Sequence, residues 1–284
     1  MKMSMKMIIN EISESNDNEI KDEDKDEDKD EENDANEEIK EEDTLKEEEK
    51  KDEESKIIGA TNEHIEKYFD NEINYDKISE GKTLLTDGEG NAIMMKWETP
   101  IMKKSAEIIT KQKKGLRILN IGFGLGIIDT FIQEYEPKKH VIIEAHEGVY
   151  NKMIKDGWKE KKGVEIHFGK WQDIIPQLTE TFDGIYFDTW GEDYTDMKEF
   201  HEHLLNILDQ ETGGHSFFNG LAATSVFFHD VACRIVECDI QELAMHIEFQ
   251  EFAVDLPPEA AWEGINRKYF TLSKYRLPVI SFGF

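Results

Sequence analysis

Two acidic residues occur in stretches whose composition favours a ligand site. Asp188 ends an apolar run, FDGIYFD, and Glu98 precedes the pair Thr99-Pro100, which can open a helix. Two carboxylates that accept hydrogen bonds from different N–H groups can orient a guanidinium and offset its charge. They also favour transfer of electron density to an attacking nitrogen as its proton leaves. The pair is a candidate clamp for a flat cation; in the alternative interpretation, Glu98 only complements the helix N-terminus.

A glycine-rich turn occupies residues 122–127, with the sequence GFGLGI. Glycines after a buried strand let the backbone approach a ligand closely where the next helix begins. A dinucleotide site requires a third glycine at position 127, where this chain has Ile127. The turn therefore favours a ligand without a pyrophosphate over NAD, with a plain tight connection between strand and helix as the alternative.

Three more side chains extend this candidate cofactor site. Glu144 follows the turn by about 20 residues, where an acidic side chain can accept both hydrogen bonds of a ribose diol. Alone, Glu144 would be an ordinary exposed carboxylate, but turn and acid together predict an adenosine-type cofactor. Trp171 and Gln172 follow the third predicted strand, where Trp171 can cover an adenine ring and Gln172 can bond its edge. Trp171 as a plain core anchor is the alternative.

The elements that must position these residues alternate along the chain. Short apolar runs predict strands, and apolar residues at helical spacing predict the segments between them. The predicted strands are residues 117–121, 140–145, 164–168, 182–187, 215–218, 246–255 and 268–282. The predicted helices are residues 101–112, 127–135, 148–156, 171–178, 194–208 and 226–245. This order predicts an α/β fold, with a mostly parallel sheet, helices on both faces and a C-terminal antiparallel hairpin.

The composition of the 284-residue chain limits the classes of partner that we expect it to bind. Its formal net charge of −29 argues against nucleic acid and anionic membrane surfaces and favours a basic partner. No apolar stretch approaches the roughly 18 residues that span a bilayer. Cys233, Cys238 and the nine histidines form no metal-ligand spacing, so we expect no metal.

The N-terminal 56 residues differ from the rest in composition. They are dominated by Asp, Glu, Lys and Asn, as in KDEDKDEDKDEEND. Such a segment buries too little apolar surface to offset the entropy of ordering it, so we expect a disordered acidic tail at 1–56 and a folded domain at 57–284. The tail either aids solubility or attracts a basic protein.

Several stretches together resemble one family. They are MMKWETPIMKKSA, ILNIGFGLGIIDTFIQ, IIEAHEGV, GKWQDIIP, FDGIYFDTW, FFNG and VDLP. From about Tyr75 onward the chain is similar to the fungal-type protein arginine N5-methyltransferases, which are relatives of guanidinoacetate N-methyltransferase. WETP, GFG and FDGIYFDT are shared by both groups, whereas EAH and FFNG resemble the arginine enzymes. Fungal members carry an ankyrin-like region where this chain has its acidic segment.

The resemblance implies a class I methyltransferase fold, a Rossmann-like seven-stranded sheet, with S-adenosylmethionine as cofactor. The cofactor-binding residues that it implies are Tyr75, Met94, Met102, Gly122, Phe123, Gly124, Leu125, Gly126, Ile127, Glu144, Ala145, His146, Trp171, Gln172 and Asp188. It also implies that Glu98 and Asp188 bind the guanidino group. We expect His146 to border the cofactor rather than act as a base.

The implied reaction is methylation of the internal (N5) guanidino nitrogen of arginine in a basic protein, with ribosomal protein as the family's substrate class. We expect a monomer in the cytoplasm, with the nucleus as an alternative location. Two other functions stay open at this point. One is methylation of a small guanidino compound, and the other is a non-catalytic binding module that keeps the fold.

Overall fold

The computed structural model describes residues 68–283 except 70, 79–81 and 192, without the side chains of residues 76–78 and 82–83. The chain divides into two compact units, Met1–Asp52 and Glu53–Phe284. All of the described residues belong to the second unit. The acidic segment predicted to be disordered, residues 1–56, lies outside the described residues.

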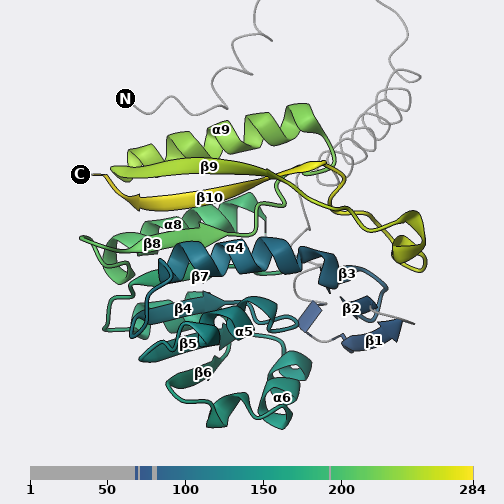
Figure 1. The fold of residues 1–284 in the computed structure, drawn as a ribbon, viewed down its shortest axis with the longest axis horizontal. Helices are drawn as coiled ribbons and strands as arrows, with labels where there is room; N and C mark the ends of the chain where they lie inside the picture. The colour runs from purple at the N-terminus through teal and green to yellow at the C-terminus, as the bar shows by residue number, and fades with distance from the viewer. Residues whose placement is uncertain (1–67, 70, 79–81, 192, 284) are drawn as a thin grey trace, which may run out of the picture. The chain divides into compact units, whose positions relative to one another are not determined.

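A seven-stranded sheet with the order β6-β5-β4-β7-β8-β10-β9 forms the centre of this unit (Figure 1). Its strands are β4 (Arg117–Ile121), β5 (Lys139–Glu144), β6 (Val164–Phe168), β7 (Gly184–Phe187), β8 (Gly214–Phe217), β9 (Met245–Ala253) and β10 (Lys274–Phe282). The pairs β6-β5, β5-β4, β4-β7 and β7-β8 are parallel, and β10 is antiparallel to both β8 and β9. The predicted α/β class I, Rossmann-like sheet with a C-terminal antiparallel hairpin is confirmed.

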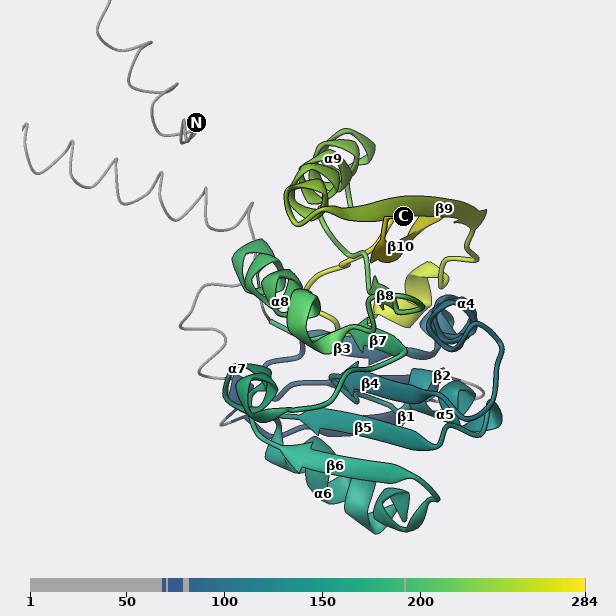
Figure 2. The ribbon, with the colours of Figure 1, turned by 90° about the vertical axis from the view of Figure 1, so that its left-hand side faces the viewer.

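Helices cover both faces of the sheet (Figure 2). They are α4 (Thr99–Thr110), α5 (Ile127–Glu134), α6 (Glu147–Lys155), α7 (Trp171–Ile174), α8 (Tyr194–Ile207) and α9 (Val226–Glu242). Successive residues of a strand point to opposite faces. Accordingly Ile118 packs in the cluster that contains α4 and α5 side chains, whereas Leu119 and Ile121 pack in the cluster that contains α7, α8 and α9 side chains.

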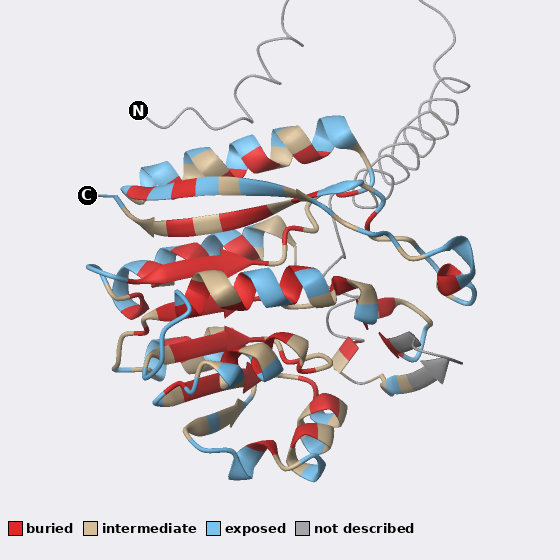
Figure 3. Cartoon of the chain, viewed as in Figure 1, coloured by how far each residue is buried: buried red, intermediate tan, exposed pale blue. Residues whose placement is uncertain are grey.

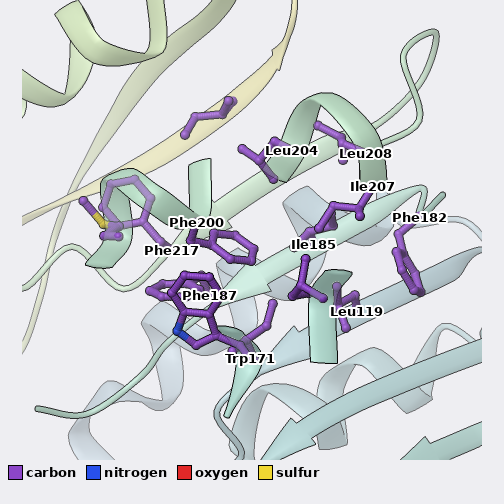
Figure 4. Close-up of a cluster of buried hydrophobic side chains, with 14 of the residues drawn as sticks. Leu119, Trp171, Phe182, Ile185, Phe187, Phe200, Leu204, Ile207, Leu208 and Phe217 are labelled. Atoms are coloured by element: carbon purple, nitrogen blue, oxygen red, sulfur yellow. The ribbon is translucent and has the colours of Figure 1, made fainter. Parts of the chain in front are cut away.

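The burial of the residues follows the same layered arrangement. The central strands are buried along their whole length, while the helices are buried only on their inner sides (Figure 3). The larger core cluster contains the stacked rings of Phe187 and Phe200, whose centroids lie 4.4 Å apart (Figure 4). None of the described helices combines the length and the apolar character that a membrane crossing requires.

A second, three-stranded antiparallel sheet was not predicted. It consists of β1 (Asn74–Ile78), β2 (Lys82–Thr86) and β3 (Ala92–Met95), and it leads through the 3-10 turn η1 (Lys96–Glu98) into α4. The β2–β3 connection is held by Asp87, whose Oδ1 accepts hydrogen bonds from the backbone N–H groups of Glu89 and Asn91. The small sheet packs against Ala261 and Trp262 of the β9–β10 connection.

Three predicted boundaries are wrong for local reasons. The helix predicted to Met245 ends at Glu242, because Ala244 adopts a left-handed conformation (φ 57°) and Met245 begins β9. The strand predicted from residue 268 begins at Lys274, because Tyr269 and Phe270 belong to an irregular connection that packs into the core. The helix predicted over 171–178 divides into α7 and the 3-10 turn η3 (Ile175–Gln177), in whose first turn Pro176 lies.

Candidate active site

The glycine turn follows β4 at the edge of the sheet where the parallel strands have their carboxyl ends. Gly122, Gly124 and Gly126 all have positive φ angles of 88°, 56° and 67°. A Cβ atom on Gly122 would lie 2.0 Å from the carbonyl oxygen of Asp188, so the turn passes directly against the end of β7. Glycine is required there for both conformation and space. The turn leaves open backbone where a ligand can approach the first residues of α5.

Glu144, at the end of β5, is buried beneath this turn. Its Oε2 accepts a hydrogen bond from the backbone N–H of Phe123 at 2.9 Å, and its Oε1 accepts one from the N–H of His146 at 2.7 Å. Burial raises the pKa of Glu144, and these backbone hydrogen bonds oppose the rise. The backbone N–H groups of Ala145 and Gly124 also favour its charged form, so backbone donors surround this carboxylate. The sequence did not indicate that Glu144 also holds the turn.

His146 and Ala145 continue from Glu144 into α6. The Nδ1 of His146 accepts the backbone N–H of Gly148 at 3.0 Å, which makes His146 the N-cap of α6. Its Nε2 lies 3.0 Å from the carbonyl oxygen of Asn71, so this nitrogen carries the proton. Burial lowers the pKa of His146. The neutral, capped ring fits a wall of the site, and Ala145 beside it is half-buried.

A buried polar network supports the turn from the sheet side, and sequence reasoning missed it. The side-chain amide of Asn120 donates to the carbonyl oxygen of Gly122 at 2.9 Å and to the Asp129 carboxylate at 2.9 and 3.0 Å. His140 Nε2 lies 3.1 Å from Asp129 Oδ1, and both side chains are fully buried. The hydrogen bonds of the Asn120 amide join the turn to α5 and thereby restrict its conformation.

The small sheet contributes Tyr75 and Met94 to the same edge. Met94 Sδ accepts the backbone N–H of Leu125 at 3.4 Å and contacts the turn at Gly124. The hydroxyl of Tyr75 is buried and has no hydrogen-bond partner among the described residues. Burial, and secondly the charge of Glu144, raise the pKa of Tyr75. A buried hydroxyl without a partner is costly unless a ligand bonds to it.

Three other predicted cofactor residues lie in packed environments. Trp171 is only 2% exposed and packs edge-to-face on Phe187 and Phe200, the arrangement of a core anchor (Figure 4). Gln172 beside it is half-buried. Met102 is fully buried on α4, where its sulfur accepts the hydroxyl of Tyr186 at 3.5 Å.

Glu98 and Asp188 meet at the N-terminus of α4 and the end of β7. Glu98 is 2% exposed, and burial raises its pKa to about 7 against the hydrogen bonds from Tyr269 and the Met95 backbone. Burial, and secondly the charge of Glu98, raise the pKa of Asp188 well above its usual range, so the two carboxylates lie within electrostatic reach of each other. Asp188 Oδ2 is buried without a hydrogen-bond partner among the described residues.

This pair could hold a cation that brings N–H donors. A carboxylate removed from water is stable when it is paired and hydrogen-bonded, and here the buried Glu98 interacts electrostatically with Asp188, whose Oδ2 is buried. A guanidinium provides the charge and a planar set of donors. In residues 68–283, as far as they are described, no group of three His, Cys, Asp or Glu side chains could hold a metal ion.

Comparisons with known proteins agree with this geometry. A sequence profile of the family described as guanidinoacetate N-methyltransferase matches residues 56–224. "Protein arginine N-methyltransferase 2" of Emericella nidulans is 46% identical over 203 residues, which are 70% of this chain and 47% of that protein. The protein of the same name from Yarrowia lipolytica is 42% identical over 214 residues, 72% of this chain and 45% of that protein. The chain thus spans about half the length of the curated relatives that it matches.

Solved structures support the fold alone. Spermidine synthase from Thermotoga maritima superimposes with a TM-score of 0.52 at 13% identity, over 75% of this chain and 70% of that chain. The resemblance stated from the motifs is confirmed for both groups of enzymes that it named, the arginine and the guanidinoacetate methyltransferases. The relatives' names specify arginine but no particular nitrogen of its guanidino group.

Proposed function

Because this chain belongs to the guanidinoacetate N-methyltransferase family, whose cofactor is S-adenosylmethionine, we propose that it methylates a guanidino nitrogen of arginine in a protein. The observation that carries this proposal is the buried Glu98 within electrostatic reach of Asp188, whose Oδ2 is buried without a hydrogen-bond partner among the described residues. The guanidino group is the chemical feature common to arginine and guanidinoacetate, and this pair fits it.

The first part of the site would hold the cofactor, which when bound supplies an electrophilic methyl group. The turn from Gly122 to Ile127 gives the ligand access to the backbone, and Glu144 at the end of β5 is the acidic side chain that suits a ribose diol. The buried hydroxyl of Tyr75 has no hydrogen-bond partner among the described residues and lies within electrostatic reach of Glu144, so a ligand there could bond to it. These features fit an adenosine-bearing ligand without a pyrophosphate.

The second part would orient the substrate. Glu98 and Asp188 accept hydrogen bonds from different N–H groups of the guanidinium, which fixes its plane and offsets its charge. The nitrogen that gains the methyl group must lose a proton, and the paired carboxylates are the acidic groups beside it. Asp188, whose pKa is raised well above its usual range, is suited to accept that proton.

We further propose that the methylated atom is the internal N5 nitrogen and that the substrate is a basic protein, a ribosomal protein among the candidates. The EAH and FFNG segments support the N5 assignment through their resemblance to the arginine N5 enzymes. The net charge of −29 supports a basic partner and argues against direct contact with nucleic acid or a membrane.

Incubation with radiolabelled S-adenosylmethionine and cell extract tests the reaction. We expect label in the protein fraction, and fragmentation mass spectra of the labelled peptides should place the methyl on N5 of arginine. Label confined to the small-molecule fraction would replace this proposal with methylation of a small guanidino compound. A methyl on a terminal nitrogen would keep arginine as the substrate but remove the N5 assignment.

Calorimetry separates an enzyme from a non-catalytic module with the same fold. We expect heat on titration with S-adenosylmethionine and thermal stabilisation of the complex. Absence of both would favour the binding module.

A further inference from the structure

A residue far along the chain contacts Glu98 directly. The hydroxyl of Tyr269, in the connection between β9 and β10, donates to Glu98 Oε1 at 2.5 Å. The same hydroxyl accepts the indole N–H of Trp97 at 3.1 Å. Trp97 and Glu98 are neighbours in η1, so the two hydrogen bonds join this connection to the turn that carries the carboxylate.

Core packing determines where Tyr269 lies. Its ring contacts Trp262 with centroids 5.5 Å apart and Trp97 with centroids 6.0 Å apart. The next residue, Phe270, is 1% exposed and packs on Tyr275 of β10. The hydroxyl is therefore presented to Glu98 by a segment that is fixed on both sides.

The hydrogen bonds to Glu98 are distributed unevenly between its two oxygens. Tyr269 and the backbone N–H of Met95, at 2.7 Å, both donate to Oε1. No hydrogen bond from the described residues ends on Oε2. The carboxylate is thus held by one oxygen, which leaves the other for an N–H group of the substrate.

We propose that Tyr269 is a positioning residue that fixes the rotation of the Glu98 carboxylate and stabilises its charged form. The catalytic part of this inference rests on the proposed function, in which Glu98 binds the guanidinium. The hydrogen bond itself is a property of the protein without substrate. A hydrogen bond to the ionised form of an acid favours that form, so the hydroxyl keeps Glu98 available as an anion.

The other ionisable groups that face Glu98 do not take this role. Asp188 at the end of β7 opposes the charge of Glu98. The hydroxyl of Tyr186 donates to Met102 Sδ, and the hydroxyl of Tyr275 donates to the carbonyl oxygen of Phe217 while it accepts the N–H of Asn219. Tyr269 is therefore the tyrosine that donates to Glu98.

The substitution Tyr269→Phe tests the proposal, with Tyr194→Phe as the matched control. Tyr194 is also a partly buried tyrosine that donates to a carboxylate, that of Asp239, but this pair joins α8 to α9 outside the site. The first measurement is the titration of Glu98 in the substrate-free protein by difference infrared spectroscopy, with the Glu98→Gln variant identifying its band. In Tyr269→Phe the midpoint should rise by about one pH unit.

The second measurement is the pH profile of kcat/KM with an arginine-containing substrate. In Tyr269→Phe the acidic limb should move upward with the Glu98 midpoint, and kcat/KM at pH 7 should fall roughly fivefold, as the ionised fraction of Glu98 does. The dissociation constant of S-adenosylmethionine and the whole profile of Tyr194→Phe should stay unchanged.

An unshifted Glu98 midpoint in Tyr269→Phe would overturn the proposal, as would an equal shift in Tyr194→Phe. A shifted midpoint with an unmoved acidic limb would overturn the catalytic part of the inference. If the parent protein methylates no guanidino compound, the proposed function fails, but the infrared titration still decides whether Tyr269 controls the charge of Glu98.

Discussion

Two buried carboxylate sites lie at the same edge of the sheet, and they differ in how their oxygens are satisfied. Both oxygens of Glu144 accept backbone N–H groups, from Phe123 and His146, within one compact segment. By contrast, Asp188 Oδ2 has no partner among the described residues, and the hydrogen bonds to Glu98 end on one oxygen.

The site therefore has two halves. We call the part around Glu144 the prepared half, and the part formed by Glu98 and Asp188 the incomplete half. The backbone around Glu144 is already held by hydrogen bonds in the protein without ligand. We therefore expect a cofactor to bind there with little rearrangement. Glu98 and Asp188 repel each other and stay partly unsatisfied until a cation with N–H donors arrives. Without ligand, the incomplete half is therefore less stable than the prepared half, as expected where a strained group serves a function.

The largest expected effect comes from Glu98→Gln. The amide preserves the shape but removes the negative charge that would offset the guanidinium, so kcat/KM should fall by about 10² to 10³-fold. Binding of S-adenosylmethionine, measured by calorimetry, should stay close to that of the parent. Asp188→Asn should be as severe in turnover, with a mixed effect on cofactor binding because Asp188 adjoins both parts of the site.

The exposed Glu248 on β9 provides the control, since Glu248→Gln makes the same chemical change away from the site. Turnover of Glu98→Gln equal to that of this control would remove the clamp role of Glu98.

The next effect belongs to the prepared half. Gly122→Ala places a Cβ atom 2.0 Å from the carbonyl oxygen of Asp188 at a φ of 88°, so the turn must move. We expect unfolding to become easier by about 3 kcal/mol and cofactor binding to be lost. Gly115→Ala is the matched control, because Gly115 has a similar φ of 78° but no atom within 4 Å of the added Cβ. That control should cost about 1 kcal/mol in chemical denaturation and leave cofactor affinity unchanged; equal losses in the two variants would contradict the close approach.

The pH dependence of stability sharpens the comparison further. Burial raises the pKa of Glu98 from 4.5 to about 7, so the folded state keeps a proton that the unfolded chain loses. Its contribution to stability is complete below pH 4.5 and is lost as the pH rises to about 7. Without ligands, the parent should therefore lose about 3 kcal/mol from this group between pH 5 and pH 8.

Glu98→Gln should lack this loss, because the amide oxygen still accepts from Met95 and Tyr269 but carries no charge. Denaturant titrations at both pH values would show the variant as the more stable protein at pH 8, although it is the less active one. Parallel stability profiles of parent and variant would mean that burial of Glu98 has little energetic effect.

How far the sequence predicts this site depends on how local each contact is. The glycine turn, Glu144 and the carboxylate after β7 could be found because strand-to-turn patterns place them at one edge of a parallel sheet. The contact of Tyr269 with Glu98 joins residues 171 positions apart and has no local signal. The role of the Asn120 amide beneath the turn was also not predicted. Its partner Asp129 lies on the buried side of α5, and the local sequence does not distinguish this position from an ordinary polar one.

The fold, too, could be predicted only where the sequence pattern is local. Alternating apolar segments predicted the seven-stranded sheet, but the small sheet that carries Tyr75 and Met94 was missed. Its strands are short, and their apolar side chains pack against Ala261 and Trp262, which the sequence places far away. Tertiary contacts of this kind override local pattern.

The smallest expected effect comes from Glu144→Gln, which removes one negative charge from the prepared half of the site. In Glu144→Gln, one oxygen becomes an NH₂ group that cannot accept the backbone N–H of Phe123 or His146, so one hydrogen bond beneath the turn is lost. We expect the affinity for S-adenosylmethionine to fall roughly tenfold, since a hydrogen bond to a charged group contributes about 1.5 kcal/mol or more. Turnover at saturating cofactor should change little, because Glu98 and Asp188 are intact. Calorimetry for affinity and kcat at high cofactor concentration separate the two quantities; a fall in kcat at unchanged affinity would mean that the two halves are not independent.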